Sequence, residues 1–195
     1  MKPRIDNDRI LEAALQSFGA YGYRKTTLED VAQQLGIQPA SLYAYCTSKR
    51  DLYEQTVRYA MLRWQNRVKE AVSACDDPRA QLVTLCRTAL NHLAGDPSFC
   101  ALLKNDPAIF PMFPAVDPCE EINAESVDMI RRILTAGAAQ GRFRALDAQA
   151  TAELLFAIYK GFILHAYVQG EERTLETWLP AALELILNGI CQKES

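Results

Sequence analysis

Residues 26–49 read TTLEDVAQQLGIQPASLYAYCTSK, and this stretch decides the fold. Thr26 precedes Glu29 by three positions, and Thr27 precedes Asp30 by three. This is the spacing of a capping box, in which a hydroxyl side chain and an acidic side chain satisfy the first backbone N–H groups of a helix. Leucine, valine and alanine then recur at helical spacing. A short amphipathic helix is therefore predicted at the start of the stretch.

A second short helix is predicted over 40–45, after a tight turn. Gly36 can end the first helix in a left-handed conformation without a Cβ clash. Pro39 suits the first turn of the next helix, where its missing N–H costs nothing. Two short helices joined in this way form a helix-turn-helix, whose second helix enters the major groove of DNA.

The stretch and its flanks resemble the DNA-binding end of the tetracycline-repressor (TetR) family of transcriptional regulators. The resemblance covers residues 6–58 and lies in the order of several motifs: FGAYGYRKTT, an acidic helix, LGI, a small-residue turn, LYAY, and SK followed shortly by an acidic residue. One position departs, because Cys46 stands where the family usually has a bulky aromatic residue. This change removes packing volume beneath the second helix.

An all-α fold with two domains is implied by this resemblance. Residues 1–50 are expected to form a three-helix DNA-binding domain that contains the helix-turn-helix. Residues 51–195 are expected to form a larger helical domain for effector binding and dimerisation. The family's usual activity is repression, in which a small molecule releases a homodimer from a near-palindromic operator.

Charge is distributed unevenly along a chain whose net charge is −3. Residues 1–58 carry eight basic and seven acidic residues, and the remainder carries 13 basic and 17 acidic residues. The basic residues of the first part flank the helix-turn-helix, which favours one DNA-facing end rather than a general affinity for nucleic acid.

Composition excludes several classes of protein. Apolar residues make up 49% of the 195 residues, which is too many for a disordered chain. No apolar run is long enough for a transmembrane helix, and the polar N-terminus does not match a secretory signal. We therefore expect a cytoplasmic protein.

Helices are predicted along the whole chain, without strands or repeats. The last two, over 148–168 and 175–190, are apolar around much of their circumference. Such helices must be covered on more than one side. A second subunit is the favoured cover, since these two helices typically form a four-helix dimer bundle in the family; a single large core is the alternative. The other helices are expected over 6–21, 48–75, 78–93, 97–105 and 120–139.

Candidate DNA contacts follow from the helix-turn-helix geometry and from the resemblance. Gln38 can bond adenine, Ala40 can contact a thymine methyl group, and Ser41 can bond several bases. The resemblance assigns phosphate contacts to Thr27, Tyr43, Tyr45 and Lys49, while capping or packing are simpler roles for the first three. The predicted DNA-binding set is Thr27, Gln38, Pro39, Ala40, Ser41, Tyr43, Tyr45 and Lys49.

Candidate effector contacts are aromatic and histidine side chains in the second domain, although such residues more often belong to a core. The predicted set is Trp64, His92, Phe99, Phe110, Phe113, Phe156, Tyr159 and His165. No cofactor motif, metal-ligand spacing or catalytic signature is present, so neither a cofactor nor an enzyme activity is expected.

The six cysteines leave one alternative function open. They form no CxxC pair, and in a reducing cytosol they are most simply small buried residues. A regulator switched by oxidants or electrophiles would instead use a reactive thiol, with Cys46 and Cys119 as the first candidates. An interaction module that has lost DNA binding is less favoured, because the predicted DNA-facing residues are retained.

Overall fold

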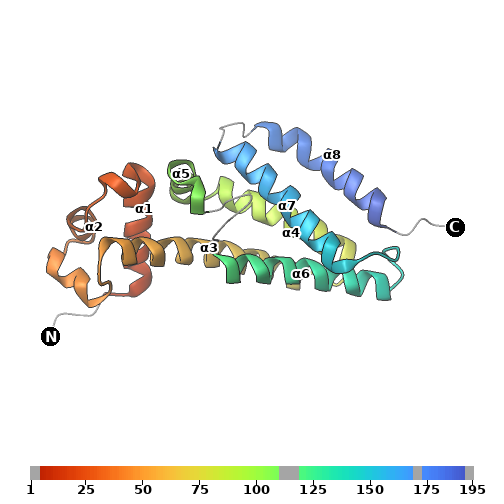
Figure 1. Cartoon of the computed structure of the whole chain (residues 1–195), viewed down its shortest axis with the longest axis horizontal. Helices are drawn as coiled ribbons and strands as arrows, with labels where there is room; N and C mark the ends of the chain where they lie inside the picture. The colour runs from red at the N-terminus through yellow and green to blue at the C-terminus, as the bar shows by residue number, and fades with distance from the viewer. Residues whose placement is uncertain (1–4, 110–118, 169–172, 192–195) are drawn as a thin grey trace.

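The described part of the chain, residues 5–109, 119–168 and 173–191 of a computed structural model, is helical apart from turns and one isolated bridge between Phe143 and Cys191. Figure 1 shows an elongated molecule with the first helices at one end and the remaining helices in a second body. The all-α prediction is confirmed. In the described ranges, no helix combines the length and apolarity needed to cross a bilayer.

The first body contains α1 (Asn7–Lys25), α2 (Leu28–Leu35) and a short 3-10 helix, η1 (Pro39–Ala44). The first helix was predicted to end at residue 21; it kinks at Gly22, which has a positive φ of 75°. After this kink, one further turn reaches Lys25. The side chain of Thr26 is buried, and its hydroxyl donates to the carbonyl oxygens of Ser17 and Gly22.

The structure decides two details that the sequence left open. Of the two threonines at capping-box spacing, Thr26 closes the end of α1 with its hydroxyl, and Thr27 is the N-cap of α2, with a complete capping box to Asp30. The predicted second short helix winds as a 3-10 helix, since Ser41 N bonds Gln38 O and Tyr45 N bonds Leu42 O. A proline start and only six residues favour this tighter winding.

A long helix, α3 (Lys49–Ser73), leaves the first body and runs into the second (Figure 1). Ser48 caps it by accepting a hydrogen bond from Asp51 N, at the start of the helix predicted over 48–75. Its 25 residues span about 37 Å at the α-helical rise. The same helix therefore contributes to the cores of both bodies.

The second body is built from α3 and the helices that follow it. The predicted helices over 78–93, 97–105 and 120–139 are confirmed as α4 (Pro78–Ala94), α5 (Pro97–Asn105) and α6 (Glu120–Ala139). A single 3-10 turn, η2 (Pro107–Ile109), follows α5. Asp77 and Asp96 cap α4 and α5 by accepting from backbone N–H groups of the first turn.

The last helices differ in detail from their prediction. The α-helix α7 (Ala148–Ile163) ends earlier than expected, and its continuation winds as a π-helix, η3 (Leu164–Val168). The final helix is α8 (Arg173–Ile190). Its end is held by a hydrogen bond from Arg144 N to Ile190 O. In Figure 1, α8 lies along the outer edge of the second body.

The two bodies are joined by close packing between α1 and α5. A Cβ atom on Gly19 would lie 2.6 Å from the carbonyl oxygen of Ser98, so only glycine allows this approach. Asn105 Nδ2 donates to Gly19 O, and Tyr53 Oη donates to Asp106. Arg63 adds a bridge from α3, because its guanidinium contacts both Glu12 and Asp96.

Glycine is also required where α6 meets the turn after it. A Cβ atom on Gly137 would lie 2.1 Å from the buried ring of Phe143. We expect Gly137→Ala to lower the free energy of unfolding by about 1–3 kcal/mol, because the added methyl group would force the buried ring of Phe143 to shift. Denaturant unfolding measures this change. Gly189→Ala is the matched control, because nothing lies within 4 Å of its Cβ position and alanine favours a helix. Equal stability of the two variants would contradict the packing.

Candidate functional site

An exposed polar face surrounds the turn between α2 and η1. Gln38, Ala40, Ser41 and Tyr43 are all exposed on η1 or immediately before it, and Pro39 is half-buried. Leu42 points the other way and is fully buried, so it anchors η1 to the core. The structure thus brings these predicted DNA-binding residues together on one short element, with the side chains on either side of Leu42 open to solvent.

Thr27 begins α2 beside this face. Its hydroxyl donates to Asp30 Oδ2 at 2.8 Å, and its backbone N–H donates to the same oxygen at 2.8 Å. The backbone and side-chain hydrogen bonds from Thr27 lower the pKa of Asp30. The capping box is therefore complete above the ordinary carboxyl range and is lost only as the pH falls through this lowered pKa. A cap is thus one role of Thr27, and its side chain stays exposed.

Lys49 and Tyr45 have partners within the chain. Lys49 Nζ donates to Thr26 O at 2.8 Å and to Arg24 O at 3.3 Å, and it lies over the ring of Tyr23. Tyr45 Oη donates to Ile5 O at 3.1 Å. Both residues thus fasten neighbouring segments around the helix-turn-helix. Tyr43 is 62% exposed, and its hydroxyl is therefore open to an external partner.

Cys46 fills the space beneath η1 where a larger residue is expected. Its side chain is only 3% exposed, and its thiol donates to Leu42 O at 3.5 Å. Burial, with a smaller effect from the charge of Asp51, raises the pKa of Cys46. This environment is typical of a structural thiol, because a reactive cysteine needs a lowered pKa and access to solvent.

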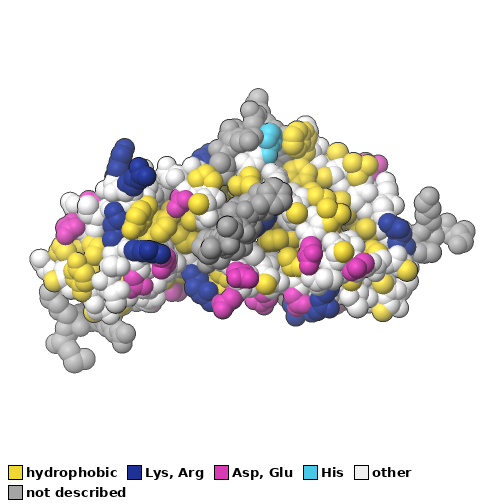
Figure 2. All heavy atoms as spheres, viewed as in Figure 1, with side chains coloured by type: hydrophobic (Ala, Val, Ile, Leu, Met, Phe, Trp, Pro, Cys, Tyr) yellow, Lys and Arg dark blue, Asp and Glu magenta, His cyan; other side chains and the backbone are white. Residues whose placement is uncertain are grey.

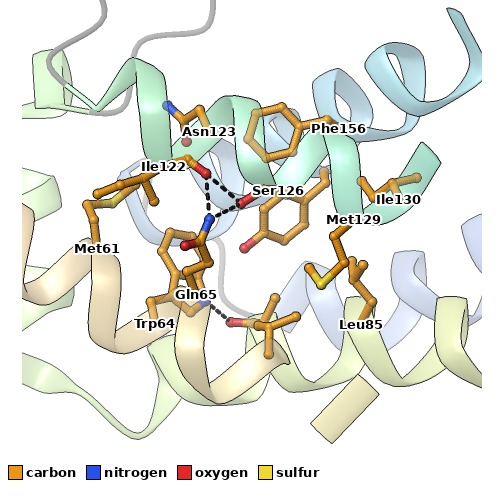
Figure 3. Close-up of a pocket in the computed structure, with 13 residues that line it drawn as sticks. Met61, Trp64, Gln65, Leu85, Ile122, Asn123, Ser126, Met129, Ile130 and Phe156 are labelled. Carbon is orange, nitrogen blue, oxygen red and sulfur yellow. Dashed lines mark hydrogen bonds between the residues drawn. The ribbon is translucent and has the colours of Figure 1, made fainter. Parts of the chain in front are cut away.

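A cavity opens in the second body between α3, α4, α6 and α7 (Figure 3). Its volume is about 40 Å³, enough for a few water molecules. Three predicted effector residues, Trp64, Phe156 and Tyr159, line it. The other lining residues are Met61, Gln65, Val68, Leu85, Ala89, Ile122, Asn123, Ser126, Met129 and Ile130.

Gln65 and Asn123 are the two buried amide side chains in the lining of this cavity, and Gln65 comes from α3. Figure 3 shows its amide nitrogen bonded to the Ile122 carbonyl and to Ser126, at 2.5 and 3.0 Å. These two bonds use both amide hydrogens and fix the orientation of the side chain. Its Oε1 atom is buried and has no hydrogen-bond partner among the residues that the structure describes. Buried polar atoms in native proteins are normally paired, so this acceptor is a notable exception.

A second cavity of about 40 Å³ adjoins the first and is covered by α8. Leu85, Ile130 and Tyr159 line both cavities and form the wall between them. Burial raises the pKa of Tyr159 well above its usual value, so its hydroxyl stays neutral. The remaining lining of the second cavity is apolar except for Cys86, whose pKa burial raises to about 11.

The other predicted effector residues lie elsewhere. Phe99 packs edge-on against Trp64 from α5 and is fully buried. His92 lines a separate polar cleft with Arg63 and Asp96, and burial lowers its pKa. His165 stacks on Trp178, with ring centroids 4.7 Å apart. Phe110 and Phe113 lie outside the described residues.

Sequence reasoning missed the polar part of the cavity lining. Gln65, Asn123 and Ser126 come from two helices, and no local motif connects them. A glutamine on the apolar face of a long helix, one residue after Trp64, is the only signal that the sequence offers. No group of three or more possible metal ligands occurs among the residues that the structure describes.

Comparisons with known proteins agree with this arrangement. Residues 10–56 match the model of a family described as bacterial regulatory proteins, tetR family. The chain is 26% identical over 185 residues to the HTH-type transcriptional repressor KstR2 of Rhodococcus jostii, covering 93% of this chain and 89% of that protein.

Solved structures of transcriptional regulators share the fold. FadR of Bacillus subtilis, solved in complex with stearoyl-CoA, superposes with a TM-score of 0.78 at 19% identity and covers 95% of this chain and all of that chain. SmeT in complex with triclosan superposes with a TM-score of 0.76 at 20% identity, covering 96% of this chain and 92% of that chain. These likenesses extend over both bodies.

The burial of Cys46 predicts slow alkylation of its thiol. We expect iodoacetamide to modify it in the native protein at least about tenfold more slowly than in urea, because thiolate formation is suppressed and access is blocked. Peptide mass mapping over time measures each site. Cys75, which is less buried and contacts Thr84, is the internal comparison. Rapid native labelling of Cys46 would contradict the packing beneath η1.

Proposed function

We propose that this chain, which belongs to the TetR family of bacterial regulatory proteins, is a transcriptional repressor that a small molecule releases from a near-palindromic DNA operator. The observation that carries the proposal is the exposed polar face of η1, held in place by the buried Leu42. A short element that is anchored on one side and polar on the other suits docking into the major groove. KstR2 is itself a transcriptional repressor, which supports the same activity here.

In this proposal, residues 1–50 are the DNA reader and residues 51–195 bind the effector and the second subunit. Gln38, Ala40 and Ser41 read base edges, with Pro39 setting the start of the helix. Thr27 and Tyr43 contact phosphates directly. Tyr45 and Lys49 support the reader, since each holds a backbone carbonyl of a neighbouring segment.

A homodimer is proposed through α7 and α8. Four large apolar side chains on these helices are exposed in the single chain: Leu154, Ile158, Trp178 and Leu185. Figure 2 shows apolar side chains gathered over this part of the surface. Such a contiguous patch marks an interface, and two symmetric readers would contact half-sites about 34 Å apart or a multiple of this distance.

Effector binding is proposed at the cavity that Trp64 and Tyr159 line. FadR and SmeT were each solved with a small molecule, which supports a ligand for this chain. Trp64 also contacts Phe99 on α5, and α5 packs against α1 at Gly19. A ligand that moves Trp64 would therefore shift the contact between the two bodies. A coupling of about 1–3 kcal/mol is sufficient for regulation.

The cysteine-switched alternative has no comparable support. Both first candidates are buried, Cys46 at 3% and Cys119 at 2% exposure. The raised pKa of Cys46 also disfavours the thiolate that reacts with oxidants.

The proposed function is tested by selecting bound DNA from a random pool and comparing variants on the enriched site. Gln38→Ala should lose preference at one base position of each half-site, because one side-chain contact to a base edge carries about 1–3 kcal/mol of discrimination. A repeated selection with the variant measures this change. Failure to enrich any sequence, or an identical consensus for the variant, would contradict the assignment.

Tyr43→Ala should weaken binding to all DNA sequences by a similar factor. A lost phosphate contact costs about 1 kcal/mol in each half-site, irrespective of the bases. Binding titrations against the selected site and unrelated DNA measure the ratio. Tyr21→Ala is the matched control, because Tyr21 is 61% exposed but lies on α1. Equal losses of DNA affinity in Tyr43→Ala and Tyr21→Ala would contradict a phosphate contact by Tyr43.

Leu185→Glu should convert the dimer to a monomer and reduce operator affinity. The side chain is 75% exposed in the single chain, so the folded subunit should tolerate the charge while the interface should not. Analytical ultracentrifugation measures the change in mass. Ala136→Glu on α6 adds the same charge at another exposed helical position. A dimer that persists in Leu185→Glu would place the interface elsewhere.

A further inference from the structure

The chemistry of the first cavity restricts what it can bind. Its lining combines apolar and aromatic side chains with the amides of Gln65 and Asn123 and the hydroxyl groups of Ser126 and Tyr159. Among the residues that the structure describes, no Asp, Glu, Lys, Arg or His lines this cavity or its neighbour. A buried carboxylate or phosphate on a ligand would find no cation in the lining itself, since the Lys160 ammonium is engaged with the Phe156 ring and lines neither cavity. An unpaired buried charge is strongly unfavourable.

A cationic ligand is disfavoured by the aromatic wall itself. The Nζ atom of Lys160 already lies 5.4 Å from the centroid of the Phe156 ring. This ammonium group occupies the electron-rich surroundings of that ring, and a second positive charge nearby would be repelled. The cavity therefore favours an uncharged occupant.

Gln65 specifies the polar group of that occupant. Both of its amide hydrogens are used within the protein, and its buried Oε1 atom lacks a donor. An oxygen in this state can only accept a hydrogen bond. A ligand with an O–H or N–H group could donate a hydrogen bond to Gln65 Oε1 after a small movement of the lining side chains. A ligand with acceptors alone would leave this oxygen unpaired.

The shape of the site indicates a ligand longer than the first cavity. That cavity is small, but it shares the lining residues Leu85, Ile130 and Tyr159 with the second cavity, which α8 covers with apolar side chains. Movement of these side chains would join the two cavities into one apolar channel. The polar end of the channel lies at Gln65, and the apolar end lies beneath α8.

We propose that the effector is an uncharged amphiphile whose hydrogen-bond donor binds Gln65 Oε1 and whose apolar part extends past Tyr159 toward α8. This inference rests on the proposed function, because it names the ligand class of the same cavity. An alcohol or a secondary amide with an alkyl or ring-shaped body has this chemistry.

Four probes that each contain an eight-carbon chain test the ligand class: 1-octanol, methyl octyl ether, octanoate and octyltrimethylammonium. Trp178→Phe leaves Trp64, in the cavity wall, as the single indole, so tryptophan fluorescence reports binding. In this background, 1-octanol should bind about fivefold more tightly than the ether, which lacks the donor. Octanoate, measured at a pH where it is ionised, and octyltrimethylammonium should bind about a hundredfold more weakly or not at all.

Gln65→Met then tests the assigned acceptor. The variant should lose the preference for 1-octanol over the ether while still binding the ether, which shows that the cavity persists. Gln149→Met, at an exposed position on α7, should keep the preference.

Three results would overturn the proposal: binding of either charged probe as tight as that of 1-octanol, no binding of any probe, or an alcohol preference that survives in Gln65→Met. The fluorescence measurement needs no DNA. Failure of the DNA-binding proposal would therefore appear separately, in the selection experiment.

Discussion

The helix α3 must satisfy two cores at once, and the rest of the structure depends on this constraint. Leu52 and Val57 are buried near its start, close to α1, whereas Trp64 and Val68 line the cavity in the second body. A continuous helix transmits rotation and translation along its length because its backbone hydrogen bonds resist bending. A change in packing around Trp64 therefore also moves the N-terminal end of α3, unless the contacts of that end with α1 and α5 break.

The contacts that join α3 and α5 to α1 are ionic and closely packed, so they resist separation. Arg63 is held by Glu12 and Asp96, one on α1 and one before α5, so that a single side chain of α3 joins both bodies. The backbone of Ser98 lies so close to Gly19 that not even a methyl group fits between α1 and α5. Tightly packed interfaces move between discrete arrangements rather than deforming continuously. The junction of α1, α3 and α5 is thus the element whose position an effector would have to change.

Much of the fold could be predicted from the sequence, because its signals are local. Asp77 with Pro78, and Ser48 with Asp51, mark helix starts through contacts within a few residues, and the helices predicted over 78–93 and 48–75 begin there. Thr26 and Thr27 both stood at capping-box spacing in the sequence, and only the buried end of α1 decides which hydroxyl caps α2. The π-helix of η3 and the partners of Lys49 depend on tertiary packing. So does the cavity, since Gln65 and Ser126 are 61 positions apart and meet only in the folded chain.

The oxygen of the Gln65 amide is unpaired because two hydrogen bonds of the amide nitrogen fix the orientation of the side chain. Had the amide been free to rotate, its oxygen could have found a donor elsewhere; the carbonyl of Ile122 and the hydroxyl of Ser126 prevent this by holding its nitrogen. Leaving a buried acceptor unsatisfied costs about 1–3 kcal/mol. A ligand that supplies a donor recovers this free energy on binding, and a similar molecule without one does not. Sites built around such a group reject analogues that lack the matching hydrogen bond more strongly than apolar pockets reject a missing methylene. Selectivity would then come from one fixed polar atom, while the aromatic and aliphatic walls, which lack its directionality, supply most of the contact area.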